Sequence, residues 1–383
     1  MSAQPLSALT TMRVGGPAED YRAAHTREEL IEAAVALWER GDDWLLLGGG
    51  SNTVVSDEGF PGPVLLVRTS GIARVDDQAL APGTVRIRVE AGHDWDALVA
   101  ECVERGWAGI EALSGIPGLA GAAPVQNIGA YGQELSDVLH SIEFLDASTF
   151  EPRRMLASEL ELGYRDSIMK QGLEGVVLSI DLELADAAIG AAESGPEPLS
   201  EPIRFAQLAT ALGVELGARV PLRTVREAVL RLRAAKGMVL DEADYDTWSA
   251  GSFFTNPIVT ERFARGLPAD APRFPVTDPS QEPAITTLEE LEAGERLRIP
   301  AQARERRVKL SAAWLIEQSG VPKGYRLPGS GASVSTKHTL AITNRGAASA
   351  ADVGELARFI VQRVQQEFGL VLVPEPNLYG IEI

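Results

Sequence analysis

Three polar residues, far apart in the chain, are of types that could carry acid–base or charge-stabilising chemistry. Arg165 lies in a run of hydrogen-bonding residues, 164–167, and its guanidinium could hold a carboxylate through two parallel hydrogen bonds. Ser252 follows a glycine and precedes two phenylalanines, and a hydroxyl enclosed by aromatic rings is suited to deliver a proton to carbon. Glu375 stands between two prolines, which fix the backbone on both sides of its carboxylate.

Each of these residues also has an ordinary structural interpretation. Arg165 could form a surface ion pair with Asp166, which would contribute little stability. Ser252 could begin a strand that places Phe253 in the core, and Glu375 could belong to a low-complexity tail. A Ser-His-Asp hydrolase is disfavoured, because the sequence has no histidine near Ser252 and no Gly-x-Ser-x-Gly motif.

Two glycine-rich segments could approach a ligand closely. The first follows three leucines and reads Gly48, Gly49, Gly50, Ser51, Asn52, Thr53; amide N–H groups exposed in such a turn form an anion site suited to a pyrophosphate. The second, residues 114–132, spaces Gly115, Gly118, Gly121, Gly129 and Gly132 among small residues. That pattern favours a backbone pressed against a large, flat ligand, but a buried, tight crossing of two chain segments would explain it equally well.

Hydrophobic spacing indicates the elements that must position these residues. Residues 10–70 read as a β–α–β unit, and the second half reads as a further α/β layer domain. Loss of periodicity over 186–200 predicts a linker or surface loop, and the Pro-rich, acidic residues 264–290 predict an insertion without evident chemistry. The expected helices are 27–38, 95–105, 224–235, 312–318 and 353–368, and the expected strands are 42–47, 64–68, 85–91, 141–146, 176–184, 252–254, 334, 340–342 and 371–373.

Composition sets limits on the class of protein. The chain has 383 residues, 45% hydrophobic and 23% charged, as in a soluble globular protein of two or three domains. It shows no membrane-length apolar run and no secretory signal, and its one cysteine, Cys102, favours a reducing, cytoplasmic setting. A net charge of −19 argues against a nucleic-acid partner.

Local charge and histidine placement give weaker signals. One basic cluster, read either as a solvated face or as a site for a small anion, comprises Arg304, Arg306, Arg307, Lys309, Lys323 and Arg326. The four histidines show no metal-ligand spacing, so no metal site is predicted. Only His338 attracts interest, because it ends a polar stretch, residues 329–338.

Taken in order, these segments resemble those of the UDP-N-acetylenolpyruvoylglucosamine reductase family. The resemblance runs from Thr10 to nearly the end of the chain and is carried by residues 47–52, 116–118, 126–132, 164–167, 251–257 and 374–375. It implies an α+β fold. A PCMH-type FAD-binding fold of two subdomains would span 1–70 and 71–185, with 370–383 returning to the active site, and a C-terminal α/β substrate-binding domain would span 200–369.

The resemblance also implies an activity and roles for single residues. A cytoplasmic, monomeric enzyme of peptidoglycan synthesis would use non-covalent FAD and NADPH to reduce UDP-N-acetylglucosamine enolpyruvate, without nucleic-acid or membrane partners. Arg165 would bind the enolpyruvyl carboxylate, Ser252 would donate the proton and Glu375 would assist. Substrate would also contact Tyr164, Lys236 and Asn256. FAD would contact Gly48, Gly49, Gly50, Ser51, Asn52, Thr53, Ile116, Pro117, Gly118, Gly121, Ala122, Asn127, Gly129, Ala130, Tyr131 and Gly132.

One departure and two alternatives accompany the resemblance. Where some members place a tyrosine over the substrate, the comparable segment 202–208 carries Phe205, and Arg204 is the charged residue that could replace the tyrosine contact. Another flavin oxidoreductase of the same fold, such as a sugar or alcohol oxidase, is the alternative enzyme; many of these tether flavin through His or Cys, of which this chain has few. A protein that binds FAD or a UDP-sugar without turnover is the third possibility.

Overall fold

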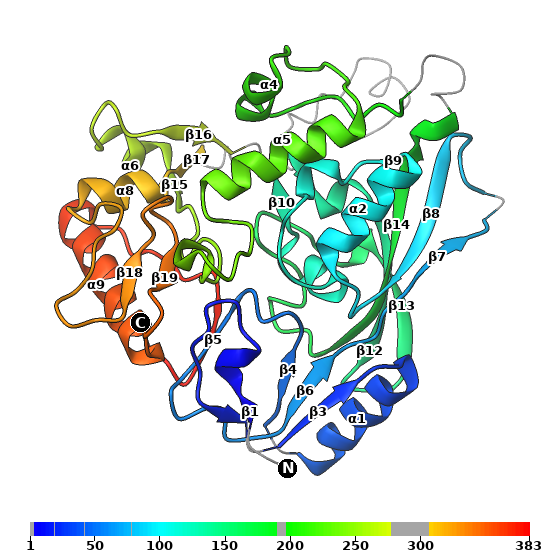
Figure 1. Cartoon of the computed structure of the whole chain (residues 1–383), viewed down its shortest axis with the longest axis horizontal. Helices are drawn as coiled ribbons and strands as arrows, with labels where there is room; N and C mark the ends of the chain where they lie inside the picture. The colour runs from blue at the N-terminus through cyan, green and yellow to red at the C-terminus, as the bar shows by residue number, and fades with distance from the viewer. Residues whose placement is uncertain (1–3, 19, 42, 78, 190–196, 277–305) are drawn as a thin grey trace, which may run out of the picture.

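The structure is a computed structural model that describes residues 4–18, 20–41, 43–77, 79–189, 197–276 and 306–383. Parts of the predicted linker and insertion, and Arg304, lie outside these ranges. Figure 1 shows the blue N-terminal region at the bottom, a cyan and green sheet on the right, and the orange and red C-terminal region on the left. None of the described helices combines the length and the apolar character that crossing a membrane requires.

A small parallel sheet forms the N-terminal region. Its strands are β3 (Tyr21–Ala24), β4 (Leu45–Leu47) and β6 (Val64–Val67), in the order β3-β6-β4. Between β3 and β4 runs α1 (Arg27–Arg40), which begins at a capping box between Thr26 and Glu29 and ends at Gly41. The β–α–β unit predicted for residues 10–70 is therefore confirmed.

The larger sheet is antiparallel and has the order β13-β12-β14-β8-β7, with β9 beside β14. Val85, Ile87 and Val89 point into one buried cluster beneath α2 (Trp95–Arg105). Arg86 and Arg88 alternate with them and pair with Glu183 and Asp181, so the predicted half-buried strand is confirmed. The strands are β7 (Ile72–Val75), β8 (Thr84–Glu90), β9 (Trp107–Ala108), β12 (Leu139–Asp146), β13 (Pro152–Leu156) and β14 (Gly175–Asp186).

The C-terminal region is built around α9 (Ala350–Phe368). This helix packs its apolar face against α8 (Ala312–Gln318) and against the hairpin of β18 (Ala332–Val334) and β19 (Ile342–Asn344). The predicted helices 312–318 and 353–368 are confirmed. Beside them lie α6 (Glu261–Arg265) and a sheet of β15 (Ile258–Thr260), β17 (Arg307–Leu310) and β16 (Arg273–Pro275).

Two further helices join the halves of the molecule. The helices α4 (Ala206–Leu212) and α5 (Leu222–Ala235) share a buried cluster that includes Ala112 of the N-terminal half. Arg226 of α5 also pairs with Asp96 of α2 at 2.6 Å. In Figure 1, α5 crosses above both halves.

The C-terminal tail returns to the first sheet region. β20 (Asn377–Tyr379) pairs in parallel with β5 (Thr53–Val55), the strand that follows the first glycine segment. The red tail can be followed to β5 in Figure 1. The last residues therefore lie beside a turn more than three hundred residues earlier in the chain.

Two predicted strands are wrong. Residues 252–254 form only a single bridge, between Phe254 and Pro374, because neighbouring N–H groups bond to different partners: Phe253 to Leu340 and Thr255 to Val373. The strand expected at 371–373 lies instead at β20. Pro374 and Pro376 have no N–H to donate, so a regular ladder begins only beyond them.

The remaining elements are short. Two hairpin-like pairs are β1 (Gln4–Pro5) with β2 (Pro17–Ala18) and β10 (Gly129–Ala130) with β11 (Gln133–Glu134). The described 3₁₀ turns are η1 (Leu6–Ala8), η2 (Glu111–Leu113), η3 (Ala120–Gln126), η4 (Leu135–Asp137), η5 (Ala157–Glu159) and η6 (Tyr245–Thr247).

Two glycines with similar φ but different surroundings yield a stability prediction. Gly41 has φ of 68° and open space around its Cα, whereas a Cβ on Gly50, with φ of 61°, would lie 2.0 Å from the Leu9 carbonyl oxygen. Gly41→Ala should lower the free energy of unfolding by about 1–2 kcal/mol, the cost of a left-handed alanine, and Gly50→Ala by distinctly more. Denaturant titration of both variants measures this; equal losses would contradict the close approach.

Candidate active site

A cavity of about 630 Å³ lies between the small sheet and the larger sheet. Both glycine segments line it, and so do Glu375, Asn377 and Tyr379 of the returning tail. The predicted FAD-contact residues that reach the cavity are Gly48, Gly49, Gly50, Ser51, Asn52, Thr53, Gly118, Gly121 and Ala122. Residues that frame the cavity but were not predicted include Gln126 and Lys170.

The two glycine segments also touch each other. A Cβ on Gly49 would lie 3.0 Å from the Cα of Gly118, and one on Gly121 would lie 2.5 Å from the Cβ of Ala91. The Ser51 hydroxyl donates to the Pro117 carbonyl at 2.9 Å. The two interpretations of the glycines are therefore compatible, since the segments cross tightly and the crossing forms a wall of the cavity.

The other predicted FAD-contact residues lie away from the cavity lining. Ile116 packs against the core of the larger sheet. Asn127 uses its side chain within the loop, donating to Glu134, Ser136 and the Gly163 carbonyl. The residues of this group that stand outside the lining are Ile116, Pro117, Asn127, Gly129, Ala130, Tyr131 and Gly132.

The guanidinium of Arg165 is held from three sides. It donates to the carbonyl oxygens of Asn127 (3.3 Å) and Gly129 (2.9 Å), and its Nε lies 3.1 Å from Oε1 of Glu375. The surface pair with Asp166 is wrong, because that carboxylate accepts from the Ser167 amide and from Gln171. Arg165 also has φ of 55°, a left-handed conformation that costs a non-glycine residue about 1–3 kcal/mol and recurs at functional sites.

Glu375 is a carboxylate removed from water. Its side chain is 15% exposed, and burial raises its pKa, while the charges of Arg165 and Lys170 act in the opposite direction. Its amide donates to the Phe253 carbonyl at 2.9 Å, and its own carbonyl accepts from Asn52 at 3.3 Å. Glu375 therefore connects the cavity, the glycine turn and the segment that carries Ser252.

Ser252 is placed by hydrogen bonds of its neighbours. Phe253 donates to Leu340 at 2.7 Å and accepts from Glu375, so Ser252 lies where the C-terminal region meets the tail. The two phenylalanines are buried, but Ser252 itself is only partly buried. Its position next to the backbone of Glu375 follows from pairing across more than a hundred residues.

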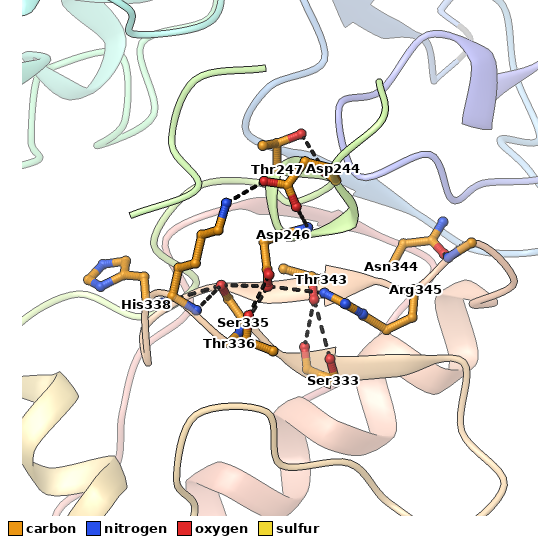
Figure 2. A network of polar contacts seen from close by, with 12 residues as sticks. Asp244, Asp246, Thr247, Ser333, Ser335, Thr336, His338, Thr343, Asn344 and Arg345 are labelled. Atoms are coloured by element: carbon orange, nitrogen blue, oxygen red, sulfur yellow. Dashed lines mark hydrogen bonds and ion pairs between the residues drawn. The ribbon is translucent and has the colours of Figure 1, made fainter. Parts of the chain in front are cut away.

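A buried polar network holds the chain just before Ser252 (Figure 2). Asp246 accepts from the hydroxyl of Ser335 (2.9 Å), the amide of Thr336 (2.8 Å) and Arg345 (3.0 Å). Burial opposes its ionisation, but the hydrogen bonds from Thr336 and Ser335 and the charge of Arg345 together hold the pKa of Asp246 below its usual value. Ser249 then forms a bridge with Thr343, which fixes the approach to Ser252.

Tyr164 and Asn256, two of the predicted substrate-contact residues, contact each other. The Asn256 amide donates to the Tyr164 hydroxyl at 3.3 Å. Lys309 of β17 lies over the same ring, with Nζ 4.4 Å from its centroid. The sequence alone is compatible with either a solvated face or an anion site for Lys309. Lys309 differs from the neighbouring arginines in its position, because it lies in β17 between the buried residues Val308 and Leu310.

A second group of cations lies near Tyr131. Lys236 donates to Gln207 at 3.1 Å and lies 5.5 Å from the Tyr131 ring, which also meets Phe205 edge-on. Burial and the charge of Arg233 lower the pKa of Lys236. Burial and the charges of Lys236 and Lys323 lower the pKa of His338 to about 4. The positive charges of Lys236 and Arg233 repel each other, so an anion bound between them would be stabilised.

Comparisons with known proteins agree over the whole chain. The profile described as UDP-N-acetylenolpyruvoylglucosamine reductase, C-terminal domain, matches residues 242–379, and one described as FAD binding domain matches residues 19–149. The UDP-N-acetylenolpyruvoylglucosamine reductase of Leifsonia xyli subsp. xyli is 56% identical, with 99% of this chain and 98% of the relative covered. That of Saccharopolyspora erythraea is 46% identical, with 97% and 94% covered.

A solved structure has the same fold. The UDP-N-acetylenolpyruvylglucosamine reductase from Thermus caldophilus superposes with a TM-score of 0.58 at 26% identity, and 99% of this chain and 98% of that chain are covered. The fold class predicted from the sequence, a PCMH-type FAD-binding fold with a C-terminal α/β domain, is confirmed.

The lowered pKa of His338 predicts a change of stability with pH. Between about pH 4 and 6.5 the unfolded chain takes up a proton on this histidine that the folded protein does not. Stability is therefore fully present above pH 6.5 and is lost as pH falls toward 4. His338→Gln should reduce this loss by about 1–3 kcal/mol, measured by denaturant unfolding at several pH values; identical pH profiles for both proteins would contradict it.

Proposed function

The chain belongs to the UDP-N-acetylenolpyruvoylglucosamine reductase family, and from this premise we propose how its residues carry out the reaction. The protein is an FAD-dependent oxidoreductase of peptidoglycan precursor synthesis. Its proposed substrate is UDP-N-acetylglucosamine enolpyruvate, its product UDP-N-acetylmuramate, and its electron donor NADPH.

The cavity between the two sheets is the proposed FAD site. Its volume, about 630 Å³, falls in the range of small-molecule sites, about 300–1,000 Å³. The turn at 48–52 offers backbone amides, and its first three residues are glycines without Cβ atoms, which suits a diphosphate. The side-chain oxygen Oε1 of Gln126 is buried without a partner among the described residues, so it supports a ligand that donates a hydrogen bond here.

The observation that carries the proposal is the contact of Glu375, which lines this cavity, with two distant parts of the chain: Arg165 and the segment that carries Ser252. Arg165 and Glu375 form an ion pair at 3.1 Å, and Glu375 lines the cavity. The hydrogen bond from Glu375 to Phe253 brings the segment of Ser252 to the same place. A cavity that only bound a ligand, without turnover, would not need an arginine, a carboxylate and a hydroxyl-bearing segment brought together.

The proposed chemistry adds a hydride and a proton across the enol-ether double bond. A bound flavin supplies the hydride. Arg165 binds the substrate carboxylate and stabilises the negative charge that develops there, which is an electrostatic contribution of the kind that dominates many enzymes. Ser252 delivers the proton to the adjacent carbon. Glu375 orients Arg165 through their ion pair.

The remaining cations are proposed to bind the sugar nucleotide. Tyr164, Asn256 and Lys309 form one wall beside Arg165. Lys236 and its neighbours offer positive charge suited to the diphosphate. Phe205 packs on Tyr131, so the segment 202–208 lies over this region without the hydroxyl that some family members provide.

The assignment of a ligand to each region of the chain is also a proposal. Residues 1–70 and 71–185 would enclose FAD, and 200–369 would bind the sugar nucleotide. The tail 370–383 would complete the site. Separate buried clusters in the small sheet, the larger sheet and the C-terminal region support this division. The pairing of β20 with β5 supports the role of the tail.

Both alternatives make distinguishable predictions. An oxidase with covalent flavin would keep its colour in the precipitate after acid treatment, and a mere binding protein would not oxidise NADPH on addition of the enolpyruvyl sugar. Family membership argues against both.

Purified full-length protein should be yellow. Because Cys102 is buried and no tether is proposed, acid precipitation should release all flavin to the supernatant, where chromatography identifies it as FAD. Colourless protein that takes up no FAD, or flavin retained in the pellet, would refute non-covalent FAD binding.

Ser252→Ala should separate the two half-reactions. Reduction of the flavin by NADPH should proceed at the wild-type rate, because no proton donor is needed there. Reoxidation by the enolpyruvyl sugar should slow by at least about a hundred- to ten-thousand-fold, the usual contribution of a general acid. Stopped-flow absorbance measures each step.

The matched control is Ser148→Ala, in the turn between β12 and β13, where the hydroxyl donates to Asp146. This variant should leave both rates unchanged. Normal turnover by Ser252→Ala would rule out Ser252 as the proton donor.

A further inference from the structure

One end of the cavity is aromatic and has no role in the mechanism. Trp38 of α1 and Trp44, just before β4, both line it, together with Leu46, Leu173 and Val177. Both indoles are only partly buried, although tryptophan is the side chain with the most apolar surface to remove from water.

The two indoles form a rigid group. Their ring centroids are 5.6 Å apart at an angle of 69°, and Trp38 stacks in parallel on Phe150 with centroids 5.8 Å apart and an angle of 2°. Trp38 is therefore fixed by partners, and it in turn limits the motion of Trp44. An aromatic surface that is ordered before a ligand arrives loses little entropy on binding.

This end lies far from the reacting groups. Strand β4 connects Trp44 to Gly48, and four residues of extended chain span about 13 Å. Glu375 lies on the other side of the glycine turn, on the segment that pairs with β5. Figure 1 shows α1, which carries Trp38, on the side of the small sheet away from α8 and α9. Along the cavity the order is thus tryptophans, glycine turn, Glu375.

We infer that Trp44, supported by Trp38, stacks on the adenine ring of FAD. This rests on the proposed FAD site. FAD has a ring system on each side of its diphosphate. If its flavin ring lies beside Glu375 and Arg165 and its diphosphate lies at residues 48–52, its adenine falls at the tryptophans. Two carboxylates line the cavity next in sequence to this group, Asp43 before Trp44 and Glu174 after Leu173, and both are acceptors that match the exocyclic amino group of adenine.

The test compares FAD with FMN, which lacks the AMP half of FAD. Full-length protein freed of flavin is titrated with each, and binding is followed by tryptophan fluorescence and by the visible spectrum of the flavin. Trp44→Leu should weaken FAD binding about ten- to a hundredfold, the range that base–aromatic stacking supplies. FMN affinity should change by less than about twofold, and Trp44→Phe should restore most of the FAD affinity.

Trp314→Leu is the matched control, because Trp314 packs against Phe368 in the C-terminal region. It should bind both flavins as the wild type does. Unchanged FAD affinity in Trp44→Leu would overturn the inference. An equal loss of FMN and FAD would also overturn it, because Trp44 would then support the fold or the flavin ring.

A measurement on the wild-type chain covers the case in which Trp44→Leu does not fold. ADP should compete with FAD and quench tryptophan fluorescence, whereas UDP at the same concentration should not compete. Failure of ADP to compete, while FAD binds, would refute the adenine stacking but not the proposed FAD site. Failure of the wild type to bind any flavin would instead refute the proposed FAD site.

Discussion

The pairing of two short extended segments, 253–255 and 373–375, is the constraint on which the candidate site depends. Two hydrogen bonds, Thr255 to Val373 at 3.1 Å and Glu375 to Phe253 at 2.9 Å, hold these segments together. Two residues beyond, Asn377 donates to Asn52 at 2.9 Å, and β20 then continues along β5. One stretch of tail therefore sets the distance between the C-terminal region, the glycine turn and the carboxylate that meets Arg165.

Arg165 illustrates how the fold orients a charge before any ligand binds. Its left-handed backbone is unfavourable by itself, and it persists because carbonyl oxygens of Asn127 and Gly129 and the carboxylate of Glu375 fix the side chain. Both carbonyls belong to the second glycine segment, so part of that segment orients an arginine rather than lining the cavity. An arginine already fixed in place requires no reorganisation when charge develops on a bound carboxylate.

The sequence predicted well those elements whose bounds depend on residues close to one another in the chain. The helices 95–105 and 312–318 were found with their bounds, because an apolar periodicity and a capping residue act within one element. The expected strands at 252–254 and 371–373 failed, because their hydrogen-bond partners lie elsewhere in the chain. The same limit explains Lys309: whether a lysine in a basic run faces solvent or covers Tyr164 depends on a partner about 145 residues away. Likewise, nothing in residues 126–132 indicates that their carbonyls face Arg165.

The net negative charge of the chain does not prevent binding of the proposed anionic ligands, because the effect of surface charges falls off with distance. A net charge of −19 creates a negative field, but salt screens exposed charges beyond about 8–10 Å at physiological ionic strength. Inside the site the nearest charges decide. Around the proposed substrate these include the cations Arg165, Lys170, Lys236 and Lys309, while the carboxylate of Glu375 is paired with Arg165. Where the glycine turn meets the cavity, backbone amides can bind an anion without contributing a net charge of their own. The surface can therefore remain acidic while the glycine turn and the cations around Arg165 favour phosphate and carboxylate groups.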